Sequence, residues 1–179
     1  MATVEHSTLT TGELHEPKGI ATANANTVYI ADGAGSGDWR LKPVGYCEYS
    51  SPTGTTITTP TTFTLVNPAT TAGFSLAEFS HNGSGRLTYT GSATIGMKLT
   101  VSLGAQQTSA GTADISLAVN GLPLGPYTSA SVTGGAGVVG LHLVSFVEFS
   151  TNDYVEVYAQ CSAGNLVVEN LVLMAEGII

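Results

Sequence analysis

The chain has 179 residues, enough for one domain with an appended arm. Apolar residues make up 42% and charged residues only 10%, so a core can form while Thr, Ser, Asn and Gly supply most of the surface polarity. The net charge is −8, and no basic residue follows Lys98. Such a chain lacks a basic stripe for nucleic-acid phosphates and would be repelled by an anionic membrane, so the sequence argues against both partners.

The first residues carry neither the basic nor the apolar region of a secretion signal, and no apolar run is long enough to span a membrane. We therefore expect neither kind of segment. The two cysteines, Cys47 and Cys161, have no Cys-x-x-Cys spacing. This pattern favours two unpaired buried thiols, and a Cys47–Cys161 bridge between the start and the end of the domain is the alternative.

Residues 1–45 differ in pattern from the rest of the chain. Residues 8–19 show neither a strand nor a helix period and end in a Pro-x-Gly turn signal. Residues 27–31 read as a short strand, followed by a glycine-rich turn at 33–37 and then Trp39. The pattern predicts an extended amino-terminal arm with one small hairpin over residues 1–45. It is too small for a core of its own and must pack on the main domain, residues 46–179, or on a partner.

Residues 50–64 contain eight threonines together with Pro52 and Pro60. The prolines exclude a central strand, so we expect extended backbone along an edge, with a disordered linker as the alternative.

From residue 62 onward, short apolar segments follow one another at regular spacing and are separated by turn residues. Strands are predicted at residues 63–66, 74–80, 86–89, 93–103, 112–119, 138–149, 154–160 and 166–175. Several alternate cleanly: Met97, Leu99, Val101 and Leu103 oppose Lys98, Thr100, Ser102 and Gly104, and Ile115, Leu117 and Val119 oppose Asp114, Ser116 and Ala118. Helix-forming patterns are nearly absent. Eight strands in two sheets predict an all-β jelly-roll β-sandwich.

The last predicted strand is apolar on both faces. Strict alternation places Leu166, Val168, Val172 and Met174 on one face and Val167, Leu171, Leu173 and Ala175 on the other. The strand at 139–149 is also two-sided. One domain needs only one such face, so we expect another copy of the chain to cover the second. The predicted oligomer interface consists of His142, Val144, Phe146, Val168, Leu171 and Leu173.

Three segments resemble a known family. Arg86-Leu-Thr-Tyr-Thr-Gly91 opens a strand, Val119-Asn-Gly-Leu-Pro123 forms a hairpin, and Phe149-Ser-Thr-Asn-Asp-Tyr-Val-Glu-Val157 leads into the penultimate strand. The order is similar to the trimeric jelly-roll modules of tailed-bacteriophage virions, which share the TNF/C1q-like sandwich. The resemblance covers about residues 84–179. Asn152-Asp153 stands where the family usually has Gly-Asp, a mild departure because Asn tolerates left-handed backbone.

The arm also resembles a family. Gly12-Glu-Leu-His-Glu-Pro-Lys-Gly19 and the stretch from Asn26 to Trp39 are similar to the amino-terminal segments of phage capsid decoration (cement) and fibre proteins. The resemblance implies a homotrimeric virion protein on the outer surface of the capsid, bound through its arm to the major capsid protein. The candidate anchoring residues are Leu14, Pro17, Val28, Tyr29, Ile30 and Trp39, with packing on the parent domain as the alternative. A head- or tail-fibre module that recognises a host receptor is the alternative function.

Residues for chemistry do not converge in the sequence. The four histidines are scattered without metal-ligand spacing, and no Gly-x-Ser-x-Gly nucleophile elbow occurs. We therefore expect no enzyme activity, no cofactor and no metal. His142 lies between apolar neighbours, so we interpret it as a core or interface histidine, with a pH-responsive contact as the alternative.

Overall fold

The structure, a computed structural model, describes residues 23–25, 27–31, 37–73, 76–135 and 137–178. By its internal contacts the chain divides into two units, Met1–Leu41 and Lys42–Ile179. The predicted boundary after residue 45 lies just inside the first strand of the second unit.

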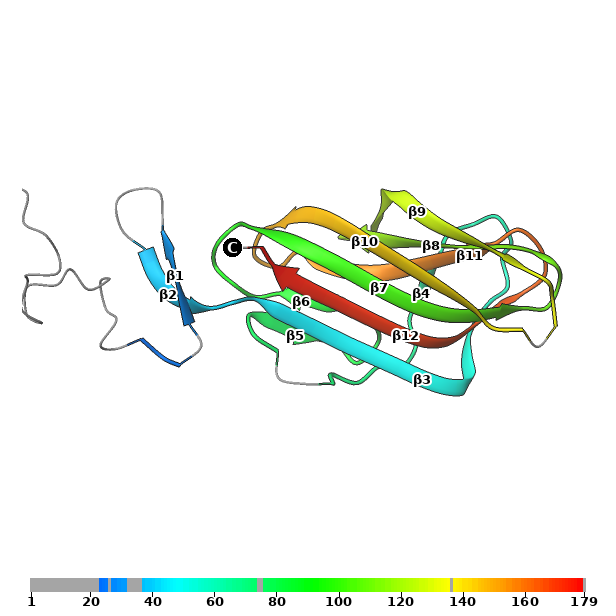
Figure 1. Ribbon diagram of the computed structural model, residues 1–179, viewed down its shortest axis with the longest axis horizontal. Helices are drawn as coiled ribbons and strands as arrows, with labels where there is room; N and C mark the ends of the chain where they lie inside the picture. Colours follow the sequence, from blue (N-terminus) through cyan, green and yellow to red (C-terminus); the bar gives the residue numbers. More distant parts are fainter. Residues whose placement is uncertain (1–22, 26, 32–36, 74–75, 136, 179) are drawn as a thin grey trace, which may run out of the picture. The chain divides into compact units, whose positions relative to one another are not determined.

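The first unit contains an antiparallel hairpin of β1 (Thr27–Ala31) and β2 (Gly37–Leu41) (Figure 1). The register sets Tyr29 opposite Trp39, and their rings meet edge to face with centroids 5.5 Å apart. This aromatic cross-strand pair supplies much of what a two-stranded hairpin needs to hold together.

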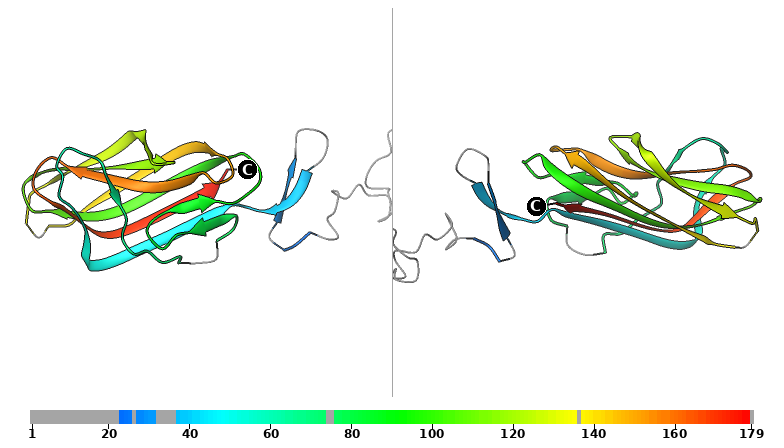
Figure 2. Two further views of the ribbon diagram at one scale, coloured as in Figure 1. Left: turned by 180° about the vertical axis from the view of Figure 1, so that it is seen from behind. Right: turned by 45° about the horizontal axis from the view of Figure 1, so that its top comes forward.

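The second unit is a sandwich of two antiparallel sheets, whose layers Figures 1 and 2 show from three directions. The four-stranded sheet has the order β10 (Val139–Phe149), β7 (Ile95–Gln107), β12 (Leu166–Gly177), β3 (Val44–Ile57). The six-stranded sheet has the order β5 (Phe79–His81), β6 (Leu87–Tyr89), β11 (Tyr154–Cys161), β8 (Gly111–Val119), β9 (Leu122–Val132), with β4 (Thr64–Val66) also paired to β11. The described residues contain no helix.

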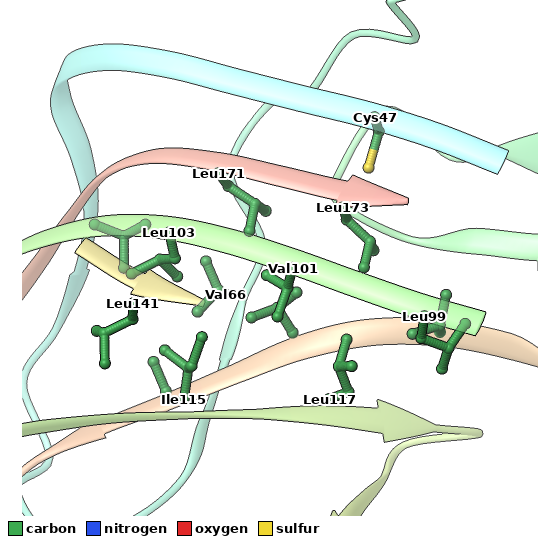
Figure 3. Packing of buried hydrophobic residues seen from close by; sticks show 14 of the residues in the cluster. Cys47, Val66, Leu99, Val101, Leu103, Ile115, Leu117, Leu141, Leu171 and Leu173 are labelled. Atoms are coloured by element: carbon green, nitrogen blue, oxygen red, sulfur yellow. The ribbon is translucent and has the colours of Figure 1, made fainter. Parts of the chain in front are cut away.

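The core fills the space between the two sheets. Leu99, Val101 and Leu103 project from β7 toward Ile115 and Leu117 of β8, and all five are buried (Figure 3). The alternation predicted for β7 is therefore confirmed, whereas in β8 the opposite side chains Ser116 and Ala118 are buried as well. Each leucine-sized side chain that leaves water here contributes about 1.5–3 kcal/mol, so this layer holds the sheets together.

Two long strands are absent from the predicted strands, and both lie at the edge of a sheet. The extended edge backbone expected at residues 50–64 nevertheless coincides with the second half of β3. β3 borders the four-stranded sheet and β9 borders the six-stranded sheet. Pro52 lies within β3, and Pro123 and Gly125 lie within β9. Proline lowers strand propensity because it cannot donate to a ladder, yet an edge strand tolerates it.

β12 contains an irregularity that the sequence analysis missed. Its pairing with both neighbours shifts between Val168 and Asn170, as expected for a β-bulge. One extra residue exchanges the two faces for the rest of the strand. Val168, Leu171 and Leu173 consequently all face the core with 0% exposure. Their sequence-based assignment to the oligomer interface is corrected: they are buried within a single chain.

Candidate interaction surfaces

The outer face of the four-stranded sheet concentrates the exposed apolar side chains of the sandwich. Val144 and Phe146 of β10 are 38% and 67% exposed, and Val172 of β12 is 36% exposed. Ile178 is exposed directly after β12, and Val138 is exposed directly before β10. Exposed apolar side chains that gather on one face of a folded domain make that face a candidate interaction surface.

Two rows of side chains cross the middle of this outer face. In one row Thr100 of β7 lies between Val144 of β10 and Met174 of β12. The Thr100 hydroxyl oxygen is buried there and has no hydrogen-bond partner among the described residues. Thr100 thus adds an unpaired polar atom to an otherwise apolar row.

In the second row Ser102 lies between His142 and Val172. The Ser102 Oγ and the His142 Nδ1 form a hydrogen bond of 2.9 Å. Across β10, β7 and β12 the two rows carry no ionic group. On β3 the second row continues to the exposed Glu48, which is opposite Val172 and accepts a 2.6 Å hydrogen bond from the Tyr46 hydroxyl.

Charged side chains lie at the margin of this face. Glu176 accepts a 2.6 Å hydrogen bond from Lys42 and stands opposite Lys98 in the β12–β7 register. The hydrogen bond from Lys42, helped by the positive charges of both lysines, lowers the pKa of Glu176. These residues border a surface pocket of about 250 Å³ that Phe146 and Ile178 also line. The apolar centre therefore ends in a polar rim, the usual anatomy of an interface.

Three of the six predicted interface residues lie on this face. His142, Val144 and Phe146 point outward from the regular strand β10, as the alternation predicted. The outward side chains of β12 are instead Val167, Val172 and Met174, because the bulge displaces the pattern. Gly104, directly opposite Asn170, is the sequence signal that could have located the bulge, since glycine inside a strand often marks one.

The β1–β2 hairpin carries the remaining predicted contacts. Val28, Tyr29, Ile30 and Trp39 are half-buried, while Leu14 and Pro17 lie outside the described residues. The Arg40 guanidinium donates to the Asp38 carboxylate at 3.2 Å. A two-stranded hairpin with this many large side chains cannot enclose them by itself.

The outer face of the six-stranded sheet has a different character. Arg86 donates to Glu156 through Nε and Nη2 at 2.9 and 2.8 Å and stacks over the Tyr154 ring at 3.9 Å. Tyr127 is 58% exposed and meets the Phe63 ring at 6.1 Å between centroids. The buried Glu156 is thus neutralised, and the face offers aromatic rings and one guanidinium.

Both cysteines are free and fully buried. Burial raises the pKa of the Cys47 thiol to about 12 and also raises the pKa of Cys161. Within the described part of the chain, no group of three or more His, Cys, Asp or Glu side chains could hold a metal ion. The same part holds no helix of the length and apolarity that crossing a bilayer requires.

No protein-family model and no curated protein matches this chain. Solved structures do. The PRD1 vertex protein P5 is similar with a TM-score of 0.58 and 11% identity, over 99% of this chain and 100% of that one. Murine APRIL is similar with a TM-score of 0.52 and 8% identity, over 76% of this chain and 99% of that one.

A third structure, Eiger TNF from S. frugiperda, has a TM-score of 0.49 and 8% identity, over 76% of this chain and 94% of that one. At these identities the similarities concern the fold alone. The sandwich has the TNF-like jelly-roll fold, which confirms the fold class predicted from the sequence.

Proposed function

We propose that this chain is a structural virion protein: a homotrimeric capsid decoration, or cement, protein. Its amino-terminal arm binds the shell of the major capsid protein from outside, and the bound trimer stabilises the head. The action is cohesive rather than catalytic. The observation that carries the proposal is the apolar outer face of the four-stranded sheet on a chain whose fold is similar, over 99% of its length, to a phage vertex protein.

The outer face supports self-association energetically. Val144, Phe146 and Val172 are 38%, 67% and 36% exposed and Met174 is less exposed, so together they leave the area of fewer than two full side chains to be buried. At about 1.5–3 kcal/mol for a full side chain, covering them contributes about 2–5 kcal/mol per chain. Association costs about 4–15 kcal/mol, so this apolar centre is enough for a complex only with help from the rim. The Lys42–Glu176 pair and Lys98 supply that rim.

The arm supports attachment to a larger body. Tyr29 and Trp39 are only half-buried in a hairpin that lacks a core of its own. Three arms on one trimer convert a weak contact of each arm into firm binding, because the second and third contacts form at high effective concentration.

Particles stripped of the protein provide the test. Purified chain should rebind them and raise the temperature at which the heads open, and deletion of residues 1–40 should abolish binding while the sandwich remains folded. Tyr29→Ala and Trp39→Ala should weaken binding in the same way. Full binding by the deletion variant would contradict the role of the arm.

The self-association step has its own matched pair of variants. Phe146→Glu adds a charge to the apolar outer face, and Leu122→Glu adds the same charge to a 73% exposed leucine on the other sheet. We expect sedimentation velocity to find a trimer for the wild type and Leu122→Glu and a monomer for Phe146→Glu. A trimer for both variants would refute this assignment of the interface.

The exposed Tyr127 and the Arg86–Tyr154 stack support the second candidate, a receptor-binding module, because Tyr and Arg dominate binding hot spots. Binding of the isolated chain to host cells, without any effect on the stability of particles, would favour this candidate.

A further inference from the structure

His142 lies on the outer face of the four-stranded sheet, on its edge strand β10, in the row next to Val144. It projects outward from β10 with Gly140 and Val144 on either side along the strand. Its side chain is exposed in the single chain, and Ser102 on β7 is its hydrogen-bond partner. A histidine in this position becomes buried when a second copy covers the face.

Among the residues that the structure describes, no charged side chain stands next to the imidazole. Neighbouring strands are about 4.8 Å apart and residues advance by about 3.3 Å along a strand. By this spacing, the α-carbons of the nearest charged residues are about 10 Å or more from that of His142. These residues are Glu148 on β10, Lys98 on β7, Glu169 and Glu176 on β12, and Glu48 on β3. β9, which packs along the edge of β10, contains no titratable residue except Tyr127.

The two protonation states of the imidazole therefore respond differently to burial. The neutral ring keeps its hydrogen bond, because the Ser102 hydroxyl can donate to Nδ1. The imidazolium ring would enter the interface without a counter-ion, and an unpaired buried charge is strongly unfavourable. Ser102 offers it only a hydroxyl oxygen.

We infer that His142 makes self-association pH-dependent: copies join through the outer face of the four-stranded sheet when the imidazole is neutral and separate when it is protonated. This inference rests on the proposed self-association. The associated state binds fewer protons than the free chains, so association weakens as the pH falls.

The test is sedimentation velocity of the full chain at pH 7.5 and pH 5.5, at one ionic strength and at a concentration where about half the chains are associated at pH 7.5. We expect the wild type to dissociate at pH 5.5. His142→Gln, which keeps a polar neutral side chain, should remain associated at both pH values. His142→Phe serves as a second variant and should behave in the same way.

His81 provides the matched control. It is the other histidine in the sandwich. Its Nε2 forms a hydrogen bond with the Thr70 hydroxyl, and burial lowers its pKa. His81→Gln should dissociate at pH 5.5 as the wild type does. Circular dichroism at both pH values separates dissociation from unfolding.

Three outcomes would overturn the inference. The inference is refuted if the wild type associates equally at the two pH values. It is also refuted if both His142 variants dissociate at pH 5.5 as much as the wild type does. Either result leaves the proposed self-association intact. Dissociation that accompanies loss of the circular dichroism signal assigns the acid sensitivity to folding. A wild-type monomer at pH 7.5 is distinguishable from these, because it refutes the proposed self-association as well.

Discussion

Val168 and Leu171 are three residues apart on one strand, yet both side chains are completely buried on the same face of the sheet. Positions three apart in a regular strand face opposite ways. The register shift between Val168 and Asn170 inserts one residue into β12, and this extra residue brings both side chains to the same face. The bulge thus decides which apolar side chains of β12 lie in the core and which lie on the outer face of the sheet.

Leu171 and Val172 should respond oppositely to substitution. Leu171→Ala leaves a cavity between the sheets, so we expect the free energy of unfolding to fall by about 2–5 kcal/mol. Val172→Ala removes a side chain from the outer face and should cost much less in a monomeric background such as Phe146→Glu. Urea unfolding of the two variants measures the difference. Similar losses would place both side chains in the core and contradict the bulge.

Strict alternation was a sound guide wherever the backbone was regular. It placed Leu99, Val101 and Leu103 of β7 in the core, and it placed Val144 and Phe146 of β10 outside, as the structure confirms. It failed on β12 because alternation carries no information about an inserted residue. The apolar residues of β12 are equally hydrophobic on its two faces. Only the pairing of the backbone with the neighbouring strands shows which residues face the core and which face outward.

The sequence analysis missed β9 and found only the second half of β3, as extended edge backbone, for a different reason. β3 and β9 combine prolines and glycines with threonine and serine, a composition shared by loops and edge strands. What makes these segments strands is the ladder that a central neighbour offers, β12 for β3 and β8 for β9. That neighbour is a tertiary feature, and local propensity does not report it.

Gly104 leaves room for the Asn170 side chain at the bulge. A β-carbon built on Gly104 would collide with the Asn170 side-chain amide across the strand pair. Asn170 is exposed and its amide can turn aside, so we expect Gly104→Ala to lower the free energy of unfolding by about 1 kcal/mol, the low end of the cost of overpacking. Asn170→Ala should relieve the collision, so the double variant should be more stable than the sum of the single effects. A double-mutant cycle measures this coupling, and strict additivity would contradict the contact.

Asn152 should be replaceable by glycine but not by a β-branched residue. Its φ is 74°, in the left-handed region, at the turn between β10 and β11. Holding an ordinary side chain there costs about 1–2 kcal/mol, whereas glycine and asparagine adopt it readily. We expect Asn152→Gly to keep the thermal midpoint and Asn152→Val to lower it. A higher midpoint for Asn152→Val would show that the turn is not left-handed in solution.

His81 should make folding sensitive to acid. Thr70 Oγ1 accepts the backbone N–H of Gly85 at 2.7 Å and lies 2.7 Å from His81 Nε2, so its hydroxyl proton is directed to a neutral imidazole. Burial lowers the pKa of His81, and the folded state therefore binds fewer protons than the unfolded chain. Stability is full above the ordinary histidine pKa and declines as the pH falls through the lower folded pKa.

Urea unfolding at pH 7.5 and pH 5.5 measures this effect. In the Phe146→Glu background, which separates folding from association, the drop in the free energy of unfolding between the two pH values should shrink when His81 is replaced by Gln. An unchanged drop would assign the acid sensitivity to other groups.

The two thiols should be inert in the folded chain and reactive after unfolding. Cys47 projects from β3 and Cys161 from β11, so they belong to different sheets, and both are fully buried. The pKa of Cys47, raised to about 12 by burial, leaves almost no thiolate at pH 8, and the thiolate is the reactive form. We expect a thiol reagent to modify neither residue in buffer and both in about 8 M urea without reductant, well past the unfolding midpoint for a domain of this size. If the unfolded chain is labelled only after a reductant is added, the two cysteines form a Cys47–Cys161 bridge. Rapid labelling of the folded chain in buffer would instead show that one edge of the sandwich opens readily.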